Sequence, residues 1–479
     1  MKIKTGGRSC YKAPEPNSAK LMNTENLTAF NLKSQLRKQH KMCNKINLHK
    51  WIVSCLAFSL IFIMACSNDE EDLEAEGGEI SIQVPTAYSF DSRFKEGESS
   101  VSYSGQVVRN LLWQDLKIFT DSLGKSGATA ASVADLNKFY DYKDSSNLQS
   151  LTTVGGGALV ESYYTAISKG KNLKGKISKD PVIGYGKPAD ALMQDWFKII
   201  ADNSQDSSKV GTPAAYTDEN GADLSQMINK VLVGAVHYYQ STGVYLNGIL
   251  EQDNSKPYKD GSAYTAMEHK WDEAFGYFGA ARDYLRYTDV NLAGKTAADF
   301  TFDSNGDGQI DFKSEYNFGL SRNAGKRDKG GSGVDFTKEI FQAFVTGRAT
   351  ISGEGDINQV AAQREIAAAG MEKVIAATVV HYINDTLDDM SKLGTADESK
   401  KNLNKHWSEM KGFTVALQYS PFKRVTVGNL QELHGIMGKG PSYDKPGTPA
   451  YKKTVANYNR AKAVLQTACG FSAANVAGW

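Results

Sequence analysis

Two histidines lie near carboxylates at helical spacing, an arrangement that can ligate a metal ion. His406 precedes Glu409 by three residues, and His269 precedes Asp272 by three and Glu273 by four. Residues three or four apart share one face of an α-helix, so each pair can present a nitrogen and an oxygen together. Most pairs of this kind are helix-stabilising or surface contacts. A site for iron or another transition metal is therefore expected only if the two helices converge.

A second candidate metal site is the segment DSNGDGQIDFKSE, which is similar to a calcium-binding loop. Side-chain oxygens recur at alternate positions, with a glycine at position six and an apolar residue at position eight. The candidate ligands are Asp303, Asn305, Asp307, Gln309, Asp311 and Glu315. Position twelve holds Ser314 instead of an acid, so either the loop is stretched to include Glu315 or another group or water completes the shell. The alternative is a glycine turn rich in Asp and Asn that binds no ion.

Other reactive groups give little support for catalysis. The chain contains no Gly-x-Ser-x-Gly, no His-Glu-x-x-His and no phosphate-binding loop motif. Cys469 has no histidine nearby in sequence and is expected to be a packed thiol. His237 and His381 stand beside tyrosines on apolar segments and are expected to be buried and satisfied by neighbours. Three acidic residues that follow His381 are interpreted as part of a solvated face: Asp385, Asp388 and Asp389.

Charge is distributed unevenly along the 479 residues. The first 66 residues hold 11 of the 55 Lys and Arg and only two acidic residues, which leaves 44 basic and 52 acidic residues in the rest. This excess of about eight negative charges favours cations over phosphates. Without a basic excess, the chain is not expected to bind nucleic acid.

The N-terminal part has the pattern of a lipoprotein signal. The apolar run 51–65 follows three lysines and is too short to span a membrane comfortably. It ends in Ile-Met-Ala before Cys66, which resembles a bacterial lipobox. We therefore expect residues 1–66 to be an upstream extension and signal peptide, with Cys66 lipidated. The acidic segment 67–80 should be a flexible tether, and the protein should lie at the outer membrane, exposed at the cell surface.

Apolar residues recur at helical spacing through the remaining chain, which predicts an all-α fold. The predicted helices include 107–123, 189–202, 223–251, 263–287, 336–351, 357–393, 401–419, 427–437 and 450–468. Long helices joined by loops favour two packed up-and-down bundles. The first bundle is expected at 81–288 and the second at 335–479, with the calcium-like loop inside a connecting segment at 289–334.

Two sequence blocks carry a family resemblance: MEHKWDEAFGYFG at 267–279 and HWSEMKGFTVALQYSPF at 406–422. Together with the lipobox, they resemble the domain-of-unknown-function family 4856 of Bacteroidetes lipoproteins. Such proteins look related in architecture to the imelysins, all-helical exported proteins implicated in iron uptake and marked by Gly-x-His-x-x-Glu. His406 and Glu409 match the end of that motif, but Asn404 replaces its glycine.

The leading functional hypothesis is a non-enzymatic lipoprotein that is anchored in the membrane by its lipid and binds a ligand or metal. It would assist iron or haem acquisition, with a TonB-dependent receptor as partner. One alternative is a surface lipoprotein that binds glycans for polysaccharide utilisation. It is disfavoured because four tryptophans fall on apolar helical stripes. The other alternative is an imelysin-type metallopeptidase that uses His406, Glu409 and His269. The oligomeric state is not predicted.

Overall fold

The computed structural model describes residues 82–331 and 333–479. The predicted signal peptide, the lipidated Cys66 and the tether lie outside these described residues.

The regular secondary structure of the described residues is almost entirely helical, which confirms the all-α prediction. Its α-helices are α2 (Ser104–Ser122), α3 (Val133–Tyr140), α4 (Tyr164–Ile167), α5 (Ala189–Gln205), α6 (Leu224–Leu232), α7 (Ala266–Phe278), α8 (Asp289–Ala293), α9 (Gly319–Gly330), α10 (Phe336–Ser352), α11 (Ile357–Ser391), α12 (Lys400–Ala416), α13 (Val427–Met437), α14 (Pro449–Cys469) and α15 (Ala473–Gly478). Two strands of two residues each, β1 (Ala158–Leu159) and β2 (Gln309–Ile310), pair in parallel.

Local capping chemistry explains where the longer helices begin and end. Helix α7 starts at a capping box, in which Thr265 accepts from the Glu268 N–H and the Glu268 carboxylate accepts from the Thr265 N–H. It ends at Gly279, whose φ of 78° lies in the left-handed region that glycine adopts without strain. The predicted helix 263–287 is therefore too long at its C-terminal end. The sequence after Gly279 forms only the short 3₁₀ turn η6 (Tyr284–Arg286).

The predicted helix 223–251 changes its winding partway along. Helix α6 continues into η5 (Val233–Leu246), a π-helix with hydrogen bonds five residues apart. Gly234 lies at this junction, where a Cβ would meet the backbone of Ala416 at 2.3 Å. A larger residue there would force α12 away, so Gly234 permits the close packing of α12 against α6 and η5.

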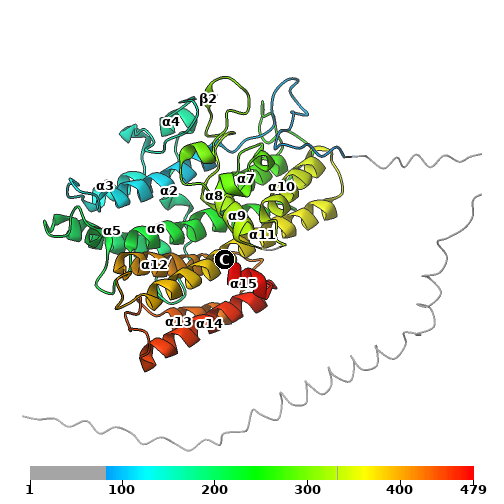
Figure 1. Ribbon diagram of the computed structural model, residues 1–479. Coiled ribbons are helices and arrows are strands. Elements are labelled where there is room, and N and C mark those ends of the chain that lie inside the picture. The colour runs from blue at the N-terminus through cyan, green and yellow to red at the C-terminus, as the bar shows by residue number, and fades with distance from the viewer. Residues whose placement is uncertain (1–81, 332) are drawn as a thin grey trace, which may run out of the picture. The chain divides into compact units, whose positions relative to one another are not determined.

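Figure 1 shows how these helices are layered within the described body. Helix α2 packs on α6, α6 on α12, α12 on α13, and α13 on α14. Helix α11 runs beside α10 and α12. It is long and apolar enough to cross a membrane, but 78% of its most apolar stretch is buried inside the body, as in a core helix.

The described residues all belong to one compact unit. Helices from both sides of the predicted connection pack directly together, including α6 with α12 and α7 with α10. The division into bundles at 81–288 and 335–479 therefore stays a prediction, because these contacts mark no boundary at 289–334.

Candidate functional site

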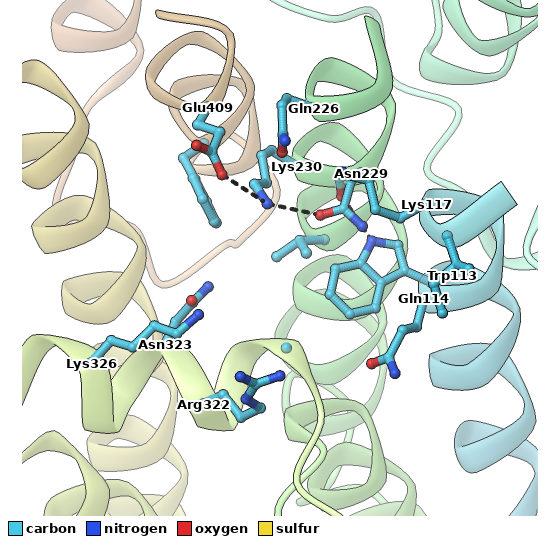
Figure 2. A pocket seen from close by; sticks show the side chains of 14 residues that line it. Trp113, Gln114, Lys117, Gln226, Asn229, Lys230, Arg322, Asn323, Lys326 and Glu409 are labelled. Carbon is cyan, nitrogen blue, oxygen red and sulfur yellow. Dashed lines mark hydrogen bonds and ion pairs between the residues drawn. The ribbon is translucent and has the colours of Figure 1, made fainter. Parts of the chain in front are cut away.

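A pocket of about 320 Å³, here called the central pocket, lies between α2, α6, α9 and α12 (Figure 2). Four basic side chains and one carboxylate line it: Lys117 from α2, Lys230 from α6, Arg322 and Lys326 from α9, and Glu409 from α12. Amide side chains add hydrogen-bonding groups from three of the same helices: Gln114, Gln226, Asn229 and Asn323. Trp113 and Phe413 supply apolar wall. The lining is therefore polar and predominantly positive.

Lys230 and Glu409 neutralise each other at one side of the central pocket. The Lys230 ammonium lies 3.3 Å from a Glu409 carboxylate oxygen and donates to the Asn229 side chain at 3.0 Å (Figure 2). Tyr382 donates a further hydrogen bond of 2.8 Å to Glu409. Burial would raise the pKa of the Glu409 carboxyl, but Lys230 and Lys405 outweigh it and lower that pKa. The pair therefore stays charged, although the second Glu409 carboxylate oxygen is buried and has no hydrogen-bond partner among the described residues.

Lys326 has no such partner. Within the described part of the chain it makes no hydrogen bond and no ion pair, although it is only partly exposed. Figure 2 shows it projecting from α9, across the pocket from Lys230 and Glu409. Burial, followed by the positive charges of Arg322 and Lys230, lowers the pKa of Lys326 to about 7. This ammonium is destabilised by its surroundings, and an anion in the pocket would relieve that cost.

The other two cations differ in their partners. Lys117 pairs with Asp121 one turn along α2. Arg322 instead donates to the carbonyl oxygens of Gly294, at 2.6 Å, and Leu292, at 3.4 Å. Arg322 and Lys326 thus bring two positive charges to the pocket without a carboxylate partner.

Besides that Glu409 oxygen, a buried amide oxygen in the lining is also unpaired. Gln226 is 6% exposed, and its side-chain oxygen accepts no hydrogen bond. A buried amide oxygen without a donor costs free energy. A ligand that carries a hydroxyl or amine beside its negative charge would satisfy it.

The positive charge of the pocket stands out against a nearly balanced body. Residues 67–81 hold seven acidic and no basic residues, so residues 82–479 carry 44 basic and 45 acidic residues. The acidic excess thus lies before the described body. The expectation that this surface favours cations over phosphates does not hold for the central pocket.

His406 and Glu409 do not meet at a common point. The His406 Nδ1 atom lies 2.7 Å from the Asp389 carboxylate, while Glu409 faces Lys230. Burial opposes a positive charge on His406, yet the hydrogen bond and charge of Asp389 outweigh it and raise the His406 pKa. The Asp385 carboxylate lies near the imidazoles of both His406 and His381, 3.9 Å from the first and 3.3 Å from the second. The interpretation of a solvated acidic face is therefore wrong for Asp389, which is 7% exposed.

The residues around His269 also separate. Its Nδ1 atom lies 3.0 Å from the carbonyl oxygen of Ser102, and its ring stacks on Tyr264. Glu273 remains 3.9 Å from the imidazole. Asp272 is fully buried and accepts a hydrogen bond of 2.9 Å from the Nε of Arg348. The three predicted ligands are therefore not gathered at one point: His269 and Glu273 lie near each other toward the solvent, and Asp272 forms an ion pair with Arg348 in the core.

The calcium-like loop folds around its own backbone. Asp303 accepts from the N–H groups of Gly306 and Gly308, and β2 at its end pairs with β1. Glu315 is 1% exposed and accepts from the N–H groups of Ser304 and Asp311. Backbone N–H groups thus hold both carboxylate oxygens of Glu315, and the way the shell would be completed stays a prediction. Calcium binding itself stays a prediction.

Across residues 82–331 and 333–479, no group of three or more His, Cys, Asp and Glu side chains is arranged to hold a metal ion. The convergence on which the transition-metal hypothesis depends is thus not seen in this part of the chain. Burial is confirmed for His237 and Cys469, whereas His381 is only partly buried. The Nδ1 atom of His237 lies 3.4 Å from the Leu232 carbonyl oxygen, but its Nε2 atom has no hydrogen-bond partner among the described residues. Cys469 is a free thiol whose pKa is raised to about 12 by burial.

Sequence reasoning missed the basic residues of the central pocket. Arg322 and Lys326 fall in the segment predicted to be a connection, where α9 has few apolar residues. Their spacing of four was the available signal, because it places both side chains on one helical face.

The comparisons with known proteins give a family but no activity. The family described as "Domain of unknown function (DUF4856)" matches residues 85–427. That span includes all four helices of the central pocket. Comparisons with curated proteins and with solved structures find no match.

Proposed function

Because this chain belongs to the DUF4856 family, whose description names no activity, we propose a function from the central pocket. The protein is a non-enzymatic, lipid-anchored outer-membrane protein that binds a small anionic ligand in this pocket. The lipid anchor and the surface location rest on the lipobox pattern that ends at Cys66.

The observation that carries this proposal is the unpaired ammonium of Lys326 opposite an already neutral Lys230–Glu409 pair. A cation held near other cations without a counter-ion is costly, and such groups are normally paired. Arg322, on the same helix, adds a second charge; it donates only to carbonyl oxygens, lies over the Phe300 ring at 3.5 Å from the centroid, and has no carboxylate partner among the described residues. A carboxylate or phosphate placed between them would complete this arrangement.

This proposal changes the form of the iron hypothesis. The proposed role is still accessory to iron or haem acquisition, with a TonB-dependent receptor as partner. The ligand would then be an anion that carries the iron, such as a ferric chelate with free carboxylates. Direct ligation by His406, Glu409 and His269 receives no support, because these side chains engage separate partners.

The two alternatives have weaker support. A glycan site would use exposed aromatic faces, yet Trp113, Trp196, Trp271 and Trp407 are all 7% exposed or less. A catalytic zinc site needs three protein ligands around one open position. The described residues contain no such cluster.

The experiment is isothermal titration calorimetry of the purified protein with inorganic phosphate and with citrate at pH 7. We expect at least one of these anions to bind, and Lys326→Met to weaken that binding roughly tenfold to a hundredfold. The reason is that a hydrogen bond to a charged group contributes about 1.5 to 3 kcal/mol.

Lys329→Met is the matched control. Lys329 lies three residues away on α9, is exposed and is not part of the pocket lining. It should bind the anion like the unmodified protein. Equal weakening in both variants would indicate a general charge effect and would overturn the proposal, as would the absence of binding to either anion.

A further inference from the structure

A second pocket, also of about 320 Å³, lies against another face of the α6 and α12 helices. Its lining comes from the turn before α5, from α5 itself, from the loop before α6 and from the segment after α13. The residues that matter for its chemistry are Tyr185, Trp196, Asp218, Lys411 and Lys439. None of them lines the central pocket.

Lys411 is a buried cation without a counter-ion. Its residue is 3% exposed, and its ammonium makes one long hydrogen bond of 3.4 Å, to the carbonyl oxygen of His434. It also lies over the Tyr185 ring, 5.7 Å from the centroid. No carboxylate of the described chain lies within ion-pair distance of it, and burial lowers its pKa to about 8. Burying a charge in this way is costly unless something pairs with it.

Two further donors in the same lining are unused. Within the described residues, neither the indole N–H of Trp196 nor the hydroxyl of Tyr185 makes a hydrogen bond. Their rings meet edge to face with centroids 6.0 Å apart. Asp218, the one acidic side chain of the lining, accepts from the N–H groups of Asn220 and Ala222. The second pocket therefore combines one unpaired cation and two free donors with aromatic surface.

We propose that the second pocket is a separate binding site for a small organic carboxylate with an apolar or aromatic body. The carboxylate pairs with Lys411, and the apolar body packs against Trp196 and Tyr185. The single buried ammonium of Lys411 suits a singly charged ligand, whereas the four basic side chains of the central pocket suit a more highly charged anion. This site is independent of the function proposed for the central pocket, since it shares no side chain with it.

The test is calorimetric titration of the full-length protein with benzoate. We expect benzoate to bind, and Lys411→Met, which keeps an unbranched side chain of nearly the same length but removes its charge, to weaken binding at least tenfold. Lys401→Met is the matched control, because Lys401 is an exposed lysine on the same helix. It should leave benzoate binding unchanged. Phosphate or citrate binding at the central pocket should persist in Lys411→Met, so failure of one site is distinguishable from failure of the other.

A second measurement does not depend on the stability of Lys411→Met. The indole N–H resonance of Trp196, assigned by its loss in Trp196→Phe, should shift in the NMR spectrum as benzoate is added. Benzoate binding that leaves this resonance unmoved, or that survives Lys411→Met unchanged, would overturn the proposal. So would a folded, unmodified protein that binds no benzoate.

Discussion

The Arg348 cluster and the central pocket both hold positive charge away from solvent, and the two regions differ in how that charge is paired. Arg348 is fully buried, and it donates to Asp272 at 2.9 Å, to Glu268 at 3.0 Å and to the Ser100 hydroxyl at 2.8 Å. In the central pocket, by contrast, Lys326 has no partner among the described residues. The first arrangement is complete without any ligand, and the second is not.

This difference separates a structural charge from a binding charge. Arg348 joins α10 to α7, and Asp272 also accepts from Tyr88, so the cluster ties the lead-in segment to the helical core. Opposing charges satisfy one another there, and no cavity adjoins them among the pockets described above. Lys326 borders a cavity, and the like charges of Arg322 and Lys230 destabilise its protonated form. Unpaired charge beside a cavity is thus the more useful guide to function in this chain.

The largest expected effect comes from breaking the complete cluster. Arg348→Met leaves Glu268 and Asp272 buried with their main counter-ion removed. Urea unfolding should show a loss of about 3 to 5 kcal/mol, the usual cost of removing one partner of a buried ion pair. Lys326→Met is the comparison variant and should lose no stability. A small loss for Arg348→Met, similar to that for Lys326→Met, would erase the distinction between the two regions.

In the calcium-like loop, as in the Arg348 cluster, buried polar groups already have partners within the chain. Calcium bound to this loop would stabilise the folded protein further. Calcium at a hundred times its dissociation constant should raise the free energy of unfolding by about 2.7 kcal/mol. Thermal unfolding with calcium chloride and with a chelator measures this effect. Asp307→Asn should remove it, while Asp260→Asn, an exposed residue of another loop, should not. Identical melting temperatures with calcium and with chelator would contradict the prediction.

The unpaired Lys326 should itself cost stability in a pH-dependent way. Its folded pKa of about 7 lies below the unfolded value of about 10.4, so the unfolded chain binds more protons between these values. The cost is fully present below pH 7 and fades as the pH rises toward 10. Lys326→Met should therefore be more stable than the unmodified protein at pH 6, by about 1 kcal/mol, because partial exposure screens the charge.

Urea unfolding of both proteins at pH 6, 8 and 10 checks this sign. The advantage of the variant should shrink at each step. An advantage that grows with pH would show that Lys326 is not destabilised in the folded protein.

The smallest expected effect concerns His406, which has the counter-ion that Lys326 lacks. Asp389 raises the His406 pKa, so this pair contributes stability that is fully present below the unfolded value of about 6.5 and is lost as the pH rises through the folded pKa. Asp389→Asn should lower the His406 pKa measured by NMR. It should also cost roughly 0.5 kcal/mol more at pH 5.5 than at pH 9. An unchanged His406 pKa would show that the contact is unimportant.

Most of the helices could be predicted from apolar periodicity and caps. The structure places α13 at the predicted bounds, and α5, α10, α11, α12 and α14 within a few residues of them. The errors have physical causes. The left-handed Gly279 ends α7 early, and the change to π-helical winding at η5 has no signal in the apolar periodicity of the segment.

The candidate site was harder to predict, because helical spacing gives a shared face but not the partner of each side chain. His406 and Glu409 have the predicted spacing, yet one binds Asp389 and the other Lys230. Asp272 was predicted to bind a metal, but it accepts a hydrogen bond from Arg348, which lies 76 residues away in the sequence. The α9 helix was not predicted because its burial comes from neighbouring helices and not from its own hydrophobicity.

The most direct test of the central claim is the affinity of sulfate at pH 6 and pH 9, measured by calorimetry on the unmodified protein and on Lys326→Arg. Sulfate keeps its charge over this range, so a change in affinity reports on the protein. We predict that the unmodified protein loses affinity by about tenfold per pH unit above pH 7, because Lys326 must then take up a proton, whereas Lys326→Arg binds equally at both values. Sulfate binding that is absent at pH 6, or that has the same pH dependence in both proteins, would contradict the assignment of Lys326 as the anion-binding group.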